Sequence, residues 1–420
     1  MSLAATAAIS SPAAWTPLQR RTVALCTAIN ALDGMDVLIV SILAPSLAAD
    51  WGVGLGQLGA IFSAGLFGMM IGCVVIAPLA DRLGRRPLVL AGLAVLAAGM
   101  LGTGLAIGVA SFAAWRTVAG IGIGVLLATV AALVGEAAPA GRRSVAIGWF
   151  QAGYPIGAVV TGLVAMHAIP AFGWQAVLLG AGAIGAAMLP LVWAWLPEST
   201  AYLMARAPLR AKPVASPAGE AVRRVPFALL FAHGRFRATL LLWLATLGGF
   251  ATLYFVTSWI TKLVVMAGLA LGDAIWATTA FNLGGFAGGL LMGALAVRYR
   301  VGALIAVFLA TAAVLMVAFG AGPPLVLLLV LAAAIGVTLQ GGFTGFYTLA
   351  AQLYPAEIRG AGIGWALGIG RGGAIVSPLV GGWLLGTEMP LWAVFACFAL
   401  PLAASGALAF AAGRRLAPGA

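Results

Sequence analysis

Long apolar runs alternate with short polar connections along the whole chain. At about 1.5 Å of rise per helical residue, about 20 apolar residues cross a hydrocarbon core about 30 Å thick. No charged residue occurs between Arg143 and Glu198 or between Arg300 and Glu357, so each gap has room for two such spans. The pattern predicts an all-α polytopic membrane protein with twelve transmembrane helices, at about residues 22–48, 57–79, 88–109, 112–135, 145–167, 174–196, 238–262, 273–296, 301–320, 324–348, 360–384 and 391–412.

The two halves of this pattern repeat each other. A Pro-Ala pair, an arginine and the triplet Ile-Gly-Trp occupy residues 139–149 and return with the same spacing in residues 355–365, 216 residues later. Two parallel six-span repeats are typical of transporters whose halves rock about a central site. We therefore divide the chain into an N-terminal half (1–196), a cytoplasmic linker (197–237) and a C-terminal half (238–420).

Composition supports a membrane protein, and the distribution of charge predicts its orientation. Hydrophobic residues make up 63% of the chain and charged residues 8%, too few charges for a surface that faces water. The net charge of +12 does not indicate nucleic-acid binding, because the basic residues lie in short loops between apolar runs. A cytoplasmic N-terminus places all but Arg116, Lys262 and Arg371 of the 22 Lys and Arg residues on the cytoplasmic side. We therefore expect a bacterial inner-membrane protein with both termini in the cytoplasm.

Two acidic residues lie in the middle of the first span. Asp33 and Asp36 are separated by Gly34 and Met35, and insertion of each carboxylate at this depth costs about 2.5 kcal/mol or more. Their i, i+3 spacing puts them on one helix face, and ionised together they would repel each other. We therefore expect at least one of them to carry a proton part of the time and to couple protons to function. The alternative is that both are ion-paired or protonated and only orient helices.

Two arginines also lie within predicted spans. Arg371 lies twelve residues past Arg359, about 18 Å from the cytoplasmic end and level with Asp33. A guanidinium at this depth needs an anion, and its planar fork suits a carboxylate. Arg371 is expected to hold a substrate carboxylate, to pair with Asp33 or Asp36, or to do both in turn. Arg116, near the outer end of the fourth span, is either a second anion contact or coupling residue, or a side chain that reaches the outer interface.

Several motifs resemble the major facilitator superfamily. The loop between the second and third spans, PLADRLGRR at residues 78–86, is similar to the signature loop of that superfamily, with Ala77 where Gly is usual. Residues 116–124 in the fourth span, with Arg116 and three spaced glycines, resemble its fourth-helix motif. Residues 197–199 and 354–359 fit the same superfamily. The resemblance implies a fold of two six-helix halves.

Within the superfamily, the chain resembles the aromatic acid:proton symporter family over essentially its whole length. The residues that carry this resemblance are DGMD at 33–36, TSW at 257–259 and GWALGIGR at 364–371, with Met35 where members often have Tyr. The resemblance implies import of 4-hydroxybenzoate, protocatechuate, benzoate or a related acid, with protons as coupling ion and no other cofactor. The expected partners are thus a small organic carboxylate, protons and the lipid bilayer, and we expect a monomer.

Charged residues beside the repeated motifs are candidates for a cytoplasmic gate. Such residues can pair with the end of a neighbouring helix in one conformation and release it in the other. The candidates are Asp81, Arg82, Arg85, Arg86, Glu136 with Arg142 and Arg143, and Glu357 with Arg359.

Polar and aromatic side chains at helical spacing are candidates for substrate contact. An aromatic ring needs an apolar slot with a few polar groups that fix it. Each candidate can equally serve helix packing, but as a set some of them should touch the substrate. The set comprises Gln340, Phe343, Thr344 and Tyr347 in the tenth span, Tyr254, Ser258 and Trp259 in the seventh, and Gln151 and Tyr154 in the fifth.

The main hypothesis is therefore a secondary active transporter that imports a small carboxylated acid with protons. The first alternative is a proton-coupled exporter of drugs or metabolites, whose span-five motif is only partly matched by GYPIG at residues 153–157. The second alternative is a membrane sensor of aromatic acids, although no stretch resembles a signalling domain. An enzyme has almost no support, because we find no nucleophile–base arrangement, metal-ligand cluster or phosphate-binding loop.

Overall fold

The computed structural model describes residues 15–139, 142–206, 227–232, 234–355, 358–387 and 389–414. Within these ranges, 12 helical segments are long and apolar enough to cross a membrane, which confirms the predicted fold class. The spans are α1 (Pro17–Trp51), α2 with its continuation (Leu55–Leu79), α4 (Arg85–Gly104), α5 (Val109–Ala137), two spans within α6 (Arg143–Trp195), α8 (Phe236–Met266), α9 (Leu271–Ala296), α10 (Val301–Gly320), α11 (Leu325–Leu353), α12 (Arg359–Leu385) and α13 (Leu391–Gly413).

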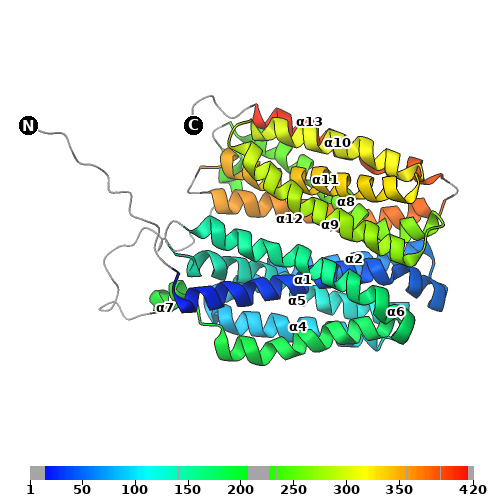
Figure 1. Cartoon of the computed structure of the whole chain (residues 1–420). Helices are drawn as coiled ribbons and strands as arrows, with labels where there is room; N and C mark the ends of the chain where they lie inside the picture. Colours follow the sequence, from blue (N-terminus) through cyan, green and yellow to red (C-terminus); the bar gives the residue numbers. More distant parts are fainter. Residues whose placement is uncertain are drawn as a thin grey trace, which may run out of the picture.

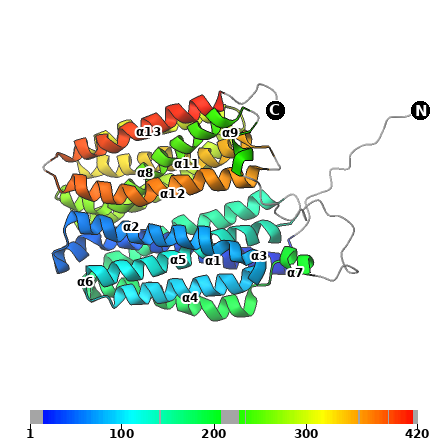
Figure 2. The same ribbon diagram turned by 180° about the vertical axis from the view of Figure 1, so that it is seen from behind.

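The spans gather in two bundles. Figure 1 shows α1–α6 in one bundle and α8–α13 in the other, and Figure 2 shows the same division from behind. Helices α1 with α6 and α4 with α5 pack together in the first bundle, as α9 with α11 and α10 with α13 do in the second. The start of α1 and the end of α13 lie on one side of the molecule (Figure 1), which we call the inner side, and the opposite side is the outer side.

One connection and one span differ from the expected pattern. The fifth and sixth spans follow each other without a loop, because Gly173 adopts a positive φ of 79° that turns the chain within α6. The second span is not a regular α-helix. It passes through a π-helical turn (Gly72–Ile76) and a 3-10 turn (Ala77–Leu79) before the short helix α3 (Ala80–Leu83). Pro78 favours this irregularity, because proline lacks the N–H that a regular helix would use.

Glycines allow the backbones of the first bundle to touch. A Cβ atom added to Gly34 of α1 would overlap the backbone carbonyl of Tyr154 in α6, and one added to Gly157 would overlap the backbone of Ala31. Small residues at helix interfaces permit this close approach in lipid, where van der Waals packing and hydrogen bonds hold helices together. The contact brings Tyr154 close to the pair of aspartates in α1.

The two bundles contact each other in the outer half of the molecule. Ser41 of α1 lies 3.3 Å from Thr261 of α8, between the two hydroxyl oxygens. The Ser63 hydroxyl of α2 donates to the backbone carbonyl of Ile375 in α12 at 2.6 Å. A Cβ on Gly59 would overlap the backbone at Pro378, so α2 and α12 also touch near their outer ends. These contacts close the outer side between the bundles.

Candidate substrate and proton site

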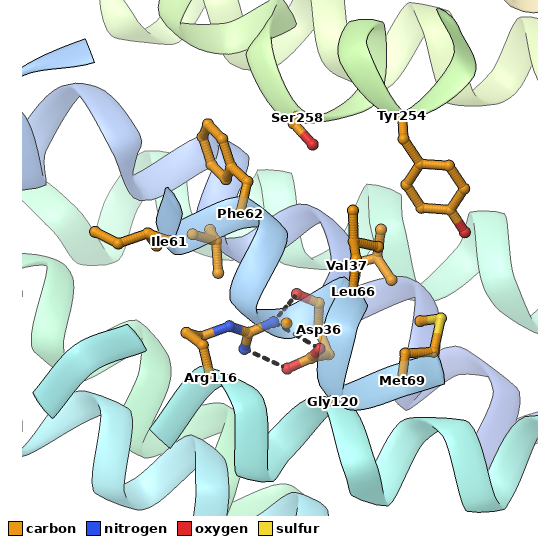
Figure 3. Close-up of a pocket in the computed structure, with 12 residues that line it drawn as sticks. Asp36, Val37, Ile61, Phe62, Leu66, Met69, Arg116, Gly120, Tyr254 and Ser258 are labelled. Atoms are coloured by element: carbon orange, nitrogen blue, oxygen red, sulfur yellow. Dashed lines mark hydrogen bonds and ion pairs between the residues drawn. The ribbon is translucent and has the colours of Figure 1, made fainter. Parts of the chain in front are cut away.

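A buried ion pair joins α1 to α5. Arg116 donates to both carboxylate oxygens of Asp36, at 2.6 Å to Oδ1 and 2.8 Å to Oδ2, and more weakly to the Asp36 backbone carbonyl at 3.4 Å (Figure 3). The two side chains are 5% and 3% exposed. Of the two alternatives for Arg116, the one in which it reaches the outer interface is wrong, because a buried carboxylate holds the guanidinium inside the bundle. Two parallel charge-assisted bonds make this a strong and directional pair.

Asp33, one turn earlier on α1, has no such partner. The residue is 8% exposed, and its Oδ1 atom is buried without a hydrogen bond in the described part of the chain. Arg371 lies near enough for its charge to act on Asp33, but it makes no ion pair with Asp33 among the described residues. A buried carboxylate oxygen without a partner is costly when ionised. The two aspartates of the motif thus have different environments: Asp36 is paired with Arg116, and Asp33 keeps a carboxylate oxygen without a partner among the described residues.

Arg371 belongs to α12, and the adjacent Gly370 packs against Phe250 of α8. Arg371 makes no hydrogen bond or ion pair with any residue that the structure describes. Asp33 of α1, Tyr254 of α8 and Tyr347 of α11 lie near enough to Arg371 for its charge to act on them. Of the two expected roles, the pair with an aspartate is not formed in this structure. Its guanidinium is therefore available to an anion.

An aromatic cluster lies beside Arg371. The ring of Phe250 stacks on Tyr254, with 6.1 Å between centroids and 14° between planes, and meets Phe343 edge-on at 4.6 Å. Phe343 also contacts Tyr347 at 5.8 Å. A Cβ on Gly370 would overlap the Phe250 ring, so the cluster lies directly against the helix that carries Arg371. Sequence reasoning missed Phe250, although it is one helical turn before Tyr254 on the same face.

A small cavity lies next to the Asp36–Arg116 pair, between α1, α2 and α5 of one bundle and α8 of the other (Figure 3). Two predicted contact residues, Tyr254 and Ser258, line it from α8. Sequence reasoning did not identify the apolar residues that form the rest of its wall, because nothing in their pattern separates them from ordinary helix packing. The cavity is lined by Asp36, Val37, Val40, Ile61, Phe62, Gly65, Leu66, Met69, Arg116, Gly120, Tyr254 and Ser258.

The other predicted contact residues lie elsewhere. Trp259 is fully buried, donates to the Pro378 carbonyl at 3.3 Å and meets Phe62 edge-on at 5.1 Å, so it belongs to the outer contact between the bundles. Gln340 packs against Gly285 of α9. Thr344 donates to the Gln340 carbonyl at 3.0 Å within α11.

Two candidates from the fifth span lie in α6. Tyr154 is within reach of the charges of Asp33 and Asp36. Gln151, one turn nearer the inner side, is exposed. Tyr154 therefore borders the aspartates, and Gln151 lies farther along the same helix.

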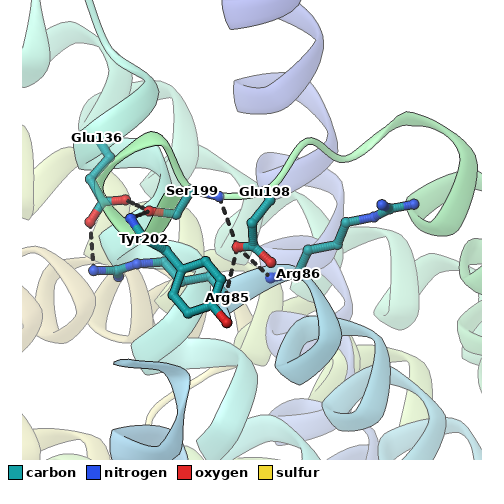
Figure 4. Close-up of polar contacts among 6 residues, drawn as sticks. All are labelled: Arg85, Arg86, Glu136, Glu198, Ser199 and Tyr202. Carbon is teal, nitrogen blue, oxygen red and sulfur yellow. Dashed lines mark hydrogen bonds and ion pairs between the residues drawn. The ribbon is translucent and has the colours of Figure 1, made fainter. Parts of the chain in front are cut away.

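On the inner side, polar contacts join α4, α5 and the segment after α6 (Figure 4). Arg85 pairs with Glu136 at 2.5 Å, and the Ser199 hydroxyl donates to the same carboxylate at 2.5 Å. Glu198 accepts from the backbone N–H groups of Arg85, Arg86 and Ser199, at 2.8, 3.2 and 2.8 Å. Sequence reasoning did not place Glu198 and Ser199 in this network, although both belong to the motif at 197–199 noted above.

The remaining gate candidates are dispersed. Glu136 bonds to Arg85 and Ser199 and not to the adjacent pair Arg142 and Arg143, because α5 and α4 run side by side. In the second bundle, Arg359 donates to the Tyr354 carbonyl at 3.3 Å. Arg82 is exposed, the Arg86 guanidinium donates to the Trp193 carbonyl, and Arg143 packs over Gly135. Glu357 and the side chain of Asp81 lie outside the described residues.

The fold and the buried charged site define a polytopic membrane transporter. The chain belongs to the Major Facilitator Superfamily, whose family model matches residues 23–275. It is a transporter of that superfamily and not an enzyme, which confirms the prediction from the sequence.

Relatives of known function extend the match over most of the chain. The gallate transporter of Pseudomonas putida is 32% identical, over 90% of this chain and 88% of its own. The 4-hydroxybenzoate transporter PcaK of Acinetobacter baylyi is 30% identical, over 92% and 89%. This confirms the predicted resemblance to carriers of aromatic acids.

Solved structures share the fold. The inward-open xylose transporter XylE of E. coli superposes with a TM-score of 0.73 at 17% identity, covering 95% of this chain and 96% of that one. A bacterial homologue of the human lysosomal transporter Spinster gives 0.71 at 16% identity, covering 96% and 98%. At this identity the likeness concerns the fold alone.

Proposed function

We propose that this transporter imports a small aromatic carboxylic acid together with protons, by alternating access. The observation that carries the proposal is the juxtaposition of an unpaired Arg371 and a buried Asp33 oxygen without a hydrogen bond, beside an aromatic cluster. Joint binding of an anion and a proton needs two groups. Arg371 can bind the anion, and Asp33, which lacks a partner, can bind the proton. The names of the relatives, carriers of gallate and 4-hydroxybenzoate, support the same substrate class.

Arg371 binds the carboxylate of the substrate. Its planar fork donates two parallel hydrogen bonds to a carboxylate, and the deep position strengthens them. The ring of the substrate then lies against Phe250, Phe343 and Tyr347, whose edges and faces favour offset or edge-on contact with another ring. The basic side chain and the aromatic rings thus suit the two parts of an aromatic carboxylate.

Asp33 carries the coupling proton. When neutral, it no longer holds an uncompensated charge in the bundle, and its proton can be donated to the substrate carboxylate. A substrate anion on Arg371 and a proton on Asp33 together leave the site without net charge, which lowers the cost of closing a dry cavity over them. Either ligand alone leaves one buried charge unpaired, and the closed state is then disfavoured.

Asp36 acts through Arg116. The ion pair keeps both charges compensated within the N-terminal half, so we assign the exchangeable proton to Asp33. The Arg85–Glu136 and Glu198 contacts hold the inner ends of α4 and α5 to the segment after α6. We take this inner side as cytoplasmic, from the charge count, with the halves 1–196 and 238–420 rocking as units joined by residues 197–237 in a monomer.

Uptake by proteoliposomes tests the proposal. Purified protein is reconstituted, and uptake of labelled benzoate, 4-hydroxybenzoate and protocatechuate is measured with and without an inward proton gradient. Gradient-driven accumulation is expected, and Asp33→Asn and Arg371→Gln should abolish it. Asp273→Asn, in the first turn of α9, and Arg298→Gln, on the inner side after α9, are matched controls that should keep it.

Each negative outcome has a distinct meaning. Uptake that is equally strong without a gradient would contradict the coupling role of Asp33. Efflux driven by the inward gradient would indicate an exporter. Absence of uptake of every aromatic acid by folded protein would contradict the substrate class.

A further inference from the structure

One face of α2 carries much of the outer contact between the bundles. Gly59, Phe62 and Ser63 are spaced i, i+3 and i+4, so they share that face. Helix α2 runs beside α12 (Figure 2), and a Cβ on Gly59 would lie 2.5 Å from the Pro378 carbonyl oxygen. Phe62 extends from α2 toward α8 (Figure 3), where it meets Trp259 edge-on at 5.1 Å between ring centroids. This face therefore touches two helices of the other bundle.

Pro378 interrupts the facing turn of α12. It has no N–H to donate to the Ala374 carbonyl, four residues earlier. The Ser377 hydroxyl donates to that carbonyl at 3.4 Å, within α12 itself. The next carbonyl, that of Ile375, accepts from the Ser63 hydroxyl of the other bundle at 2.6 Å. The interrupted turn thus offers a backbone acceptor to a side chain of α2.

The same contact continues to the outer ends of the helices through uncharged groups. A Cβ on Gly382 of α12 would lie 2.5 Å from the backbone oxygen of Leu55, at the start of α2. A Cβ on Gly381 would come within 3.0 Å of the indole nitrogen of Trp259, so this ring lies against α12. Close backbone packing and hydrogen bonds hold such an interface together. Because its residues carry no charge, their separation leaves no unpaired ion behind, unlike separation of a buried ion pair.

We propose that these residues form an outer latch, whose release opens the substrate site to the outside and whose closed state is stabilised by the Ser63 hydroxyl. The inference rests on the proposed function for alternating access alone, in which the outer contact opens and closes in each cycle. Phe62 also lines the cavity beside the Asp36–Arg116 pair, so the latch and the site share a wall. The outer latch consists of Leu55, Gly59, Phe62 and Ser63 of α2, Trp259 of α8, and Ile375, Pro378 and Gly382 of α12.

Distances between two spin labels on the outer side test the latch. The three native cysteines are replaced by alanine, and the labels are attached at Gln57→Cys in α2 and Thr387→Cys after α12, two exposed positions. The distance distribution in lipid nanodiscs gives the ratio of outer-open to outer-closed protein. Ser63→Ala removes one hydrogen bond from the closed state and should raise this ratio about two- to tenfold. Ser377→Ala removes a hydroxyl whose bond stays within α12 and should leave the ratio unchanged.

A larger side chain at the closest backbone contact should prevent closure. Gly59→Leu places its side chain against the backbone at Pro378, so the outer-open form should predominate and uptake by proteoliposomes should be lost. Gly293→Leu in α9 is the control, because a Cβ there meets no atom within 4 Å, and it should keep the wild-type distances and uptake.

The outcomes separate the latch from the proposed function. A wild-type distance distribution in Gly59→Leu would overturn the latch, and an unchanged ratio in Ser63→Ala would overturn the role of its hydroxyl. If Gly59→Leu does not fold, Ser63→Ala still decides. Aromatic-acid uptake by the wild type with unmoved distances in both variants would refute the latch alone. Shifted distances without uptake of any aromatic acid would refute the substrate class alone.

Discussion

The buried Asp36–Arg116 pair gives the sharpest prediction about stability. Arg116→Gln removes the cation and leaves the Asp36 carboxylate, whose side chain is 3% exposed, without its two charge-assisted bonds. Breaking a buried pair on one side costs about 3–5 kcal/mol, because the remaining charge stays desolvated. We expect Arg116→Gln to lower the free energy of unfolding by about that amount, and Asp36→Asn to have a similar effect.

The double variant isolates the interaction energy between Asp36 and Arg116. Asp36→Asn with Arg116→Gln leaves two neutral amides that can bond to each other, and no unpaired charge remains. We expect it to cost at least about 2 kcal/mol less than the sum of the two single variants. The measurement is denaturant or SDS unfolding of purified protein in micelles, followed by circular dichroism, for all four proteins of the cycle.

A second ion pair in the same chain serves as the control. Arg85 and Glu136 are 18% and 22% exposed, so water screens them more than it screens Asp36 and Arg116. The cycle of Arg85→Gln and Glu136→Gln should give a coupling energy of about 0.2–1 kcal/mol. Additive effects at Asp36 and Arg116, or a loss below about 1 kcal/mol in Arg116→Gln, would refute the reasoning that burial makes this pair strong.

Three further predictions concern transport and packing. Arg371→Lys keeps the charge but loses the planar fork, so the KM for 4-hydroxybenzoate uptake should rise about tenfold or more, and an unchanged KM would argue against carboxylate binding there. Lowering the outside pH at constant inside pH should raise wild-type accumulation, because protons bind outside and leave inside. Asp33→Asn cannot exchange a proton and should remove the dependence of accumulation on outside pH. If accumulation by this variant still depends on the outside pH, another residue carries the coupling proton. Gly157→Val forces a side chain into the backbone of Ala31 and should reduce the yield of monodisperse protein on size exclusion, whereas Gly56→Ala, which meets no atom within 4 Å, should not.

Much of the fold follows from the chain read locally. A segment that crosses lipid must satisfy its own backbone hydrogen bonds, so length and hydropathy suffice to predict a helix. The twelve expected spans match the 12 helical spans of the structure, with ends that differ by several residues in places. The main departures are at Gly173, where no loop separates two spans, and at Gly72–Ile76, where the helix widens. Both depend on local backbone geometry that hydropathy does not report.

The charged residues of the site were also visible in the sequence. Asp33, Asp36 and Arg371 stand out because ionisable side chains are costly at that depth, whatever surrounds them. The depth of a residue along a span follows from counting residues. The partner of each charge does not follow from counting, because it lies on a helix distant in sequence.

Tertiary structure alone decided these pairings. Asp36 meets Arg116, 80 residues away, and Asp33 is left without a partner although the two aspartates are neighbours in one motif. Glu136 meets Arg85 because α4 and α5 pack side by side, and the basic residues next to it in sequence do not compete.

Tertiary structure also decided the directions of Trp259 and Ser258. These adjacent residues of α8 point in different directions, one into the outer contact and the other into the cavity. The sequence thus determined which residues enter the membrane. The rotation and packing of the helices determined which of them meet, because side chains on a helix face different neighbours at every step of the chain.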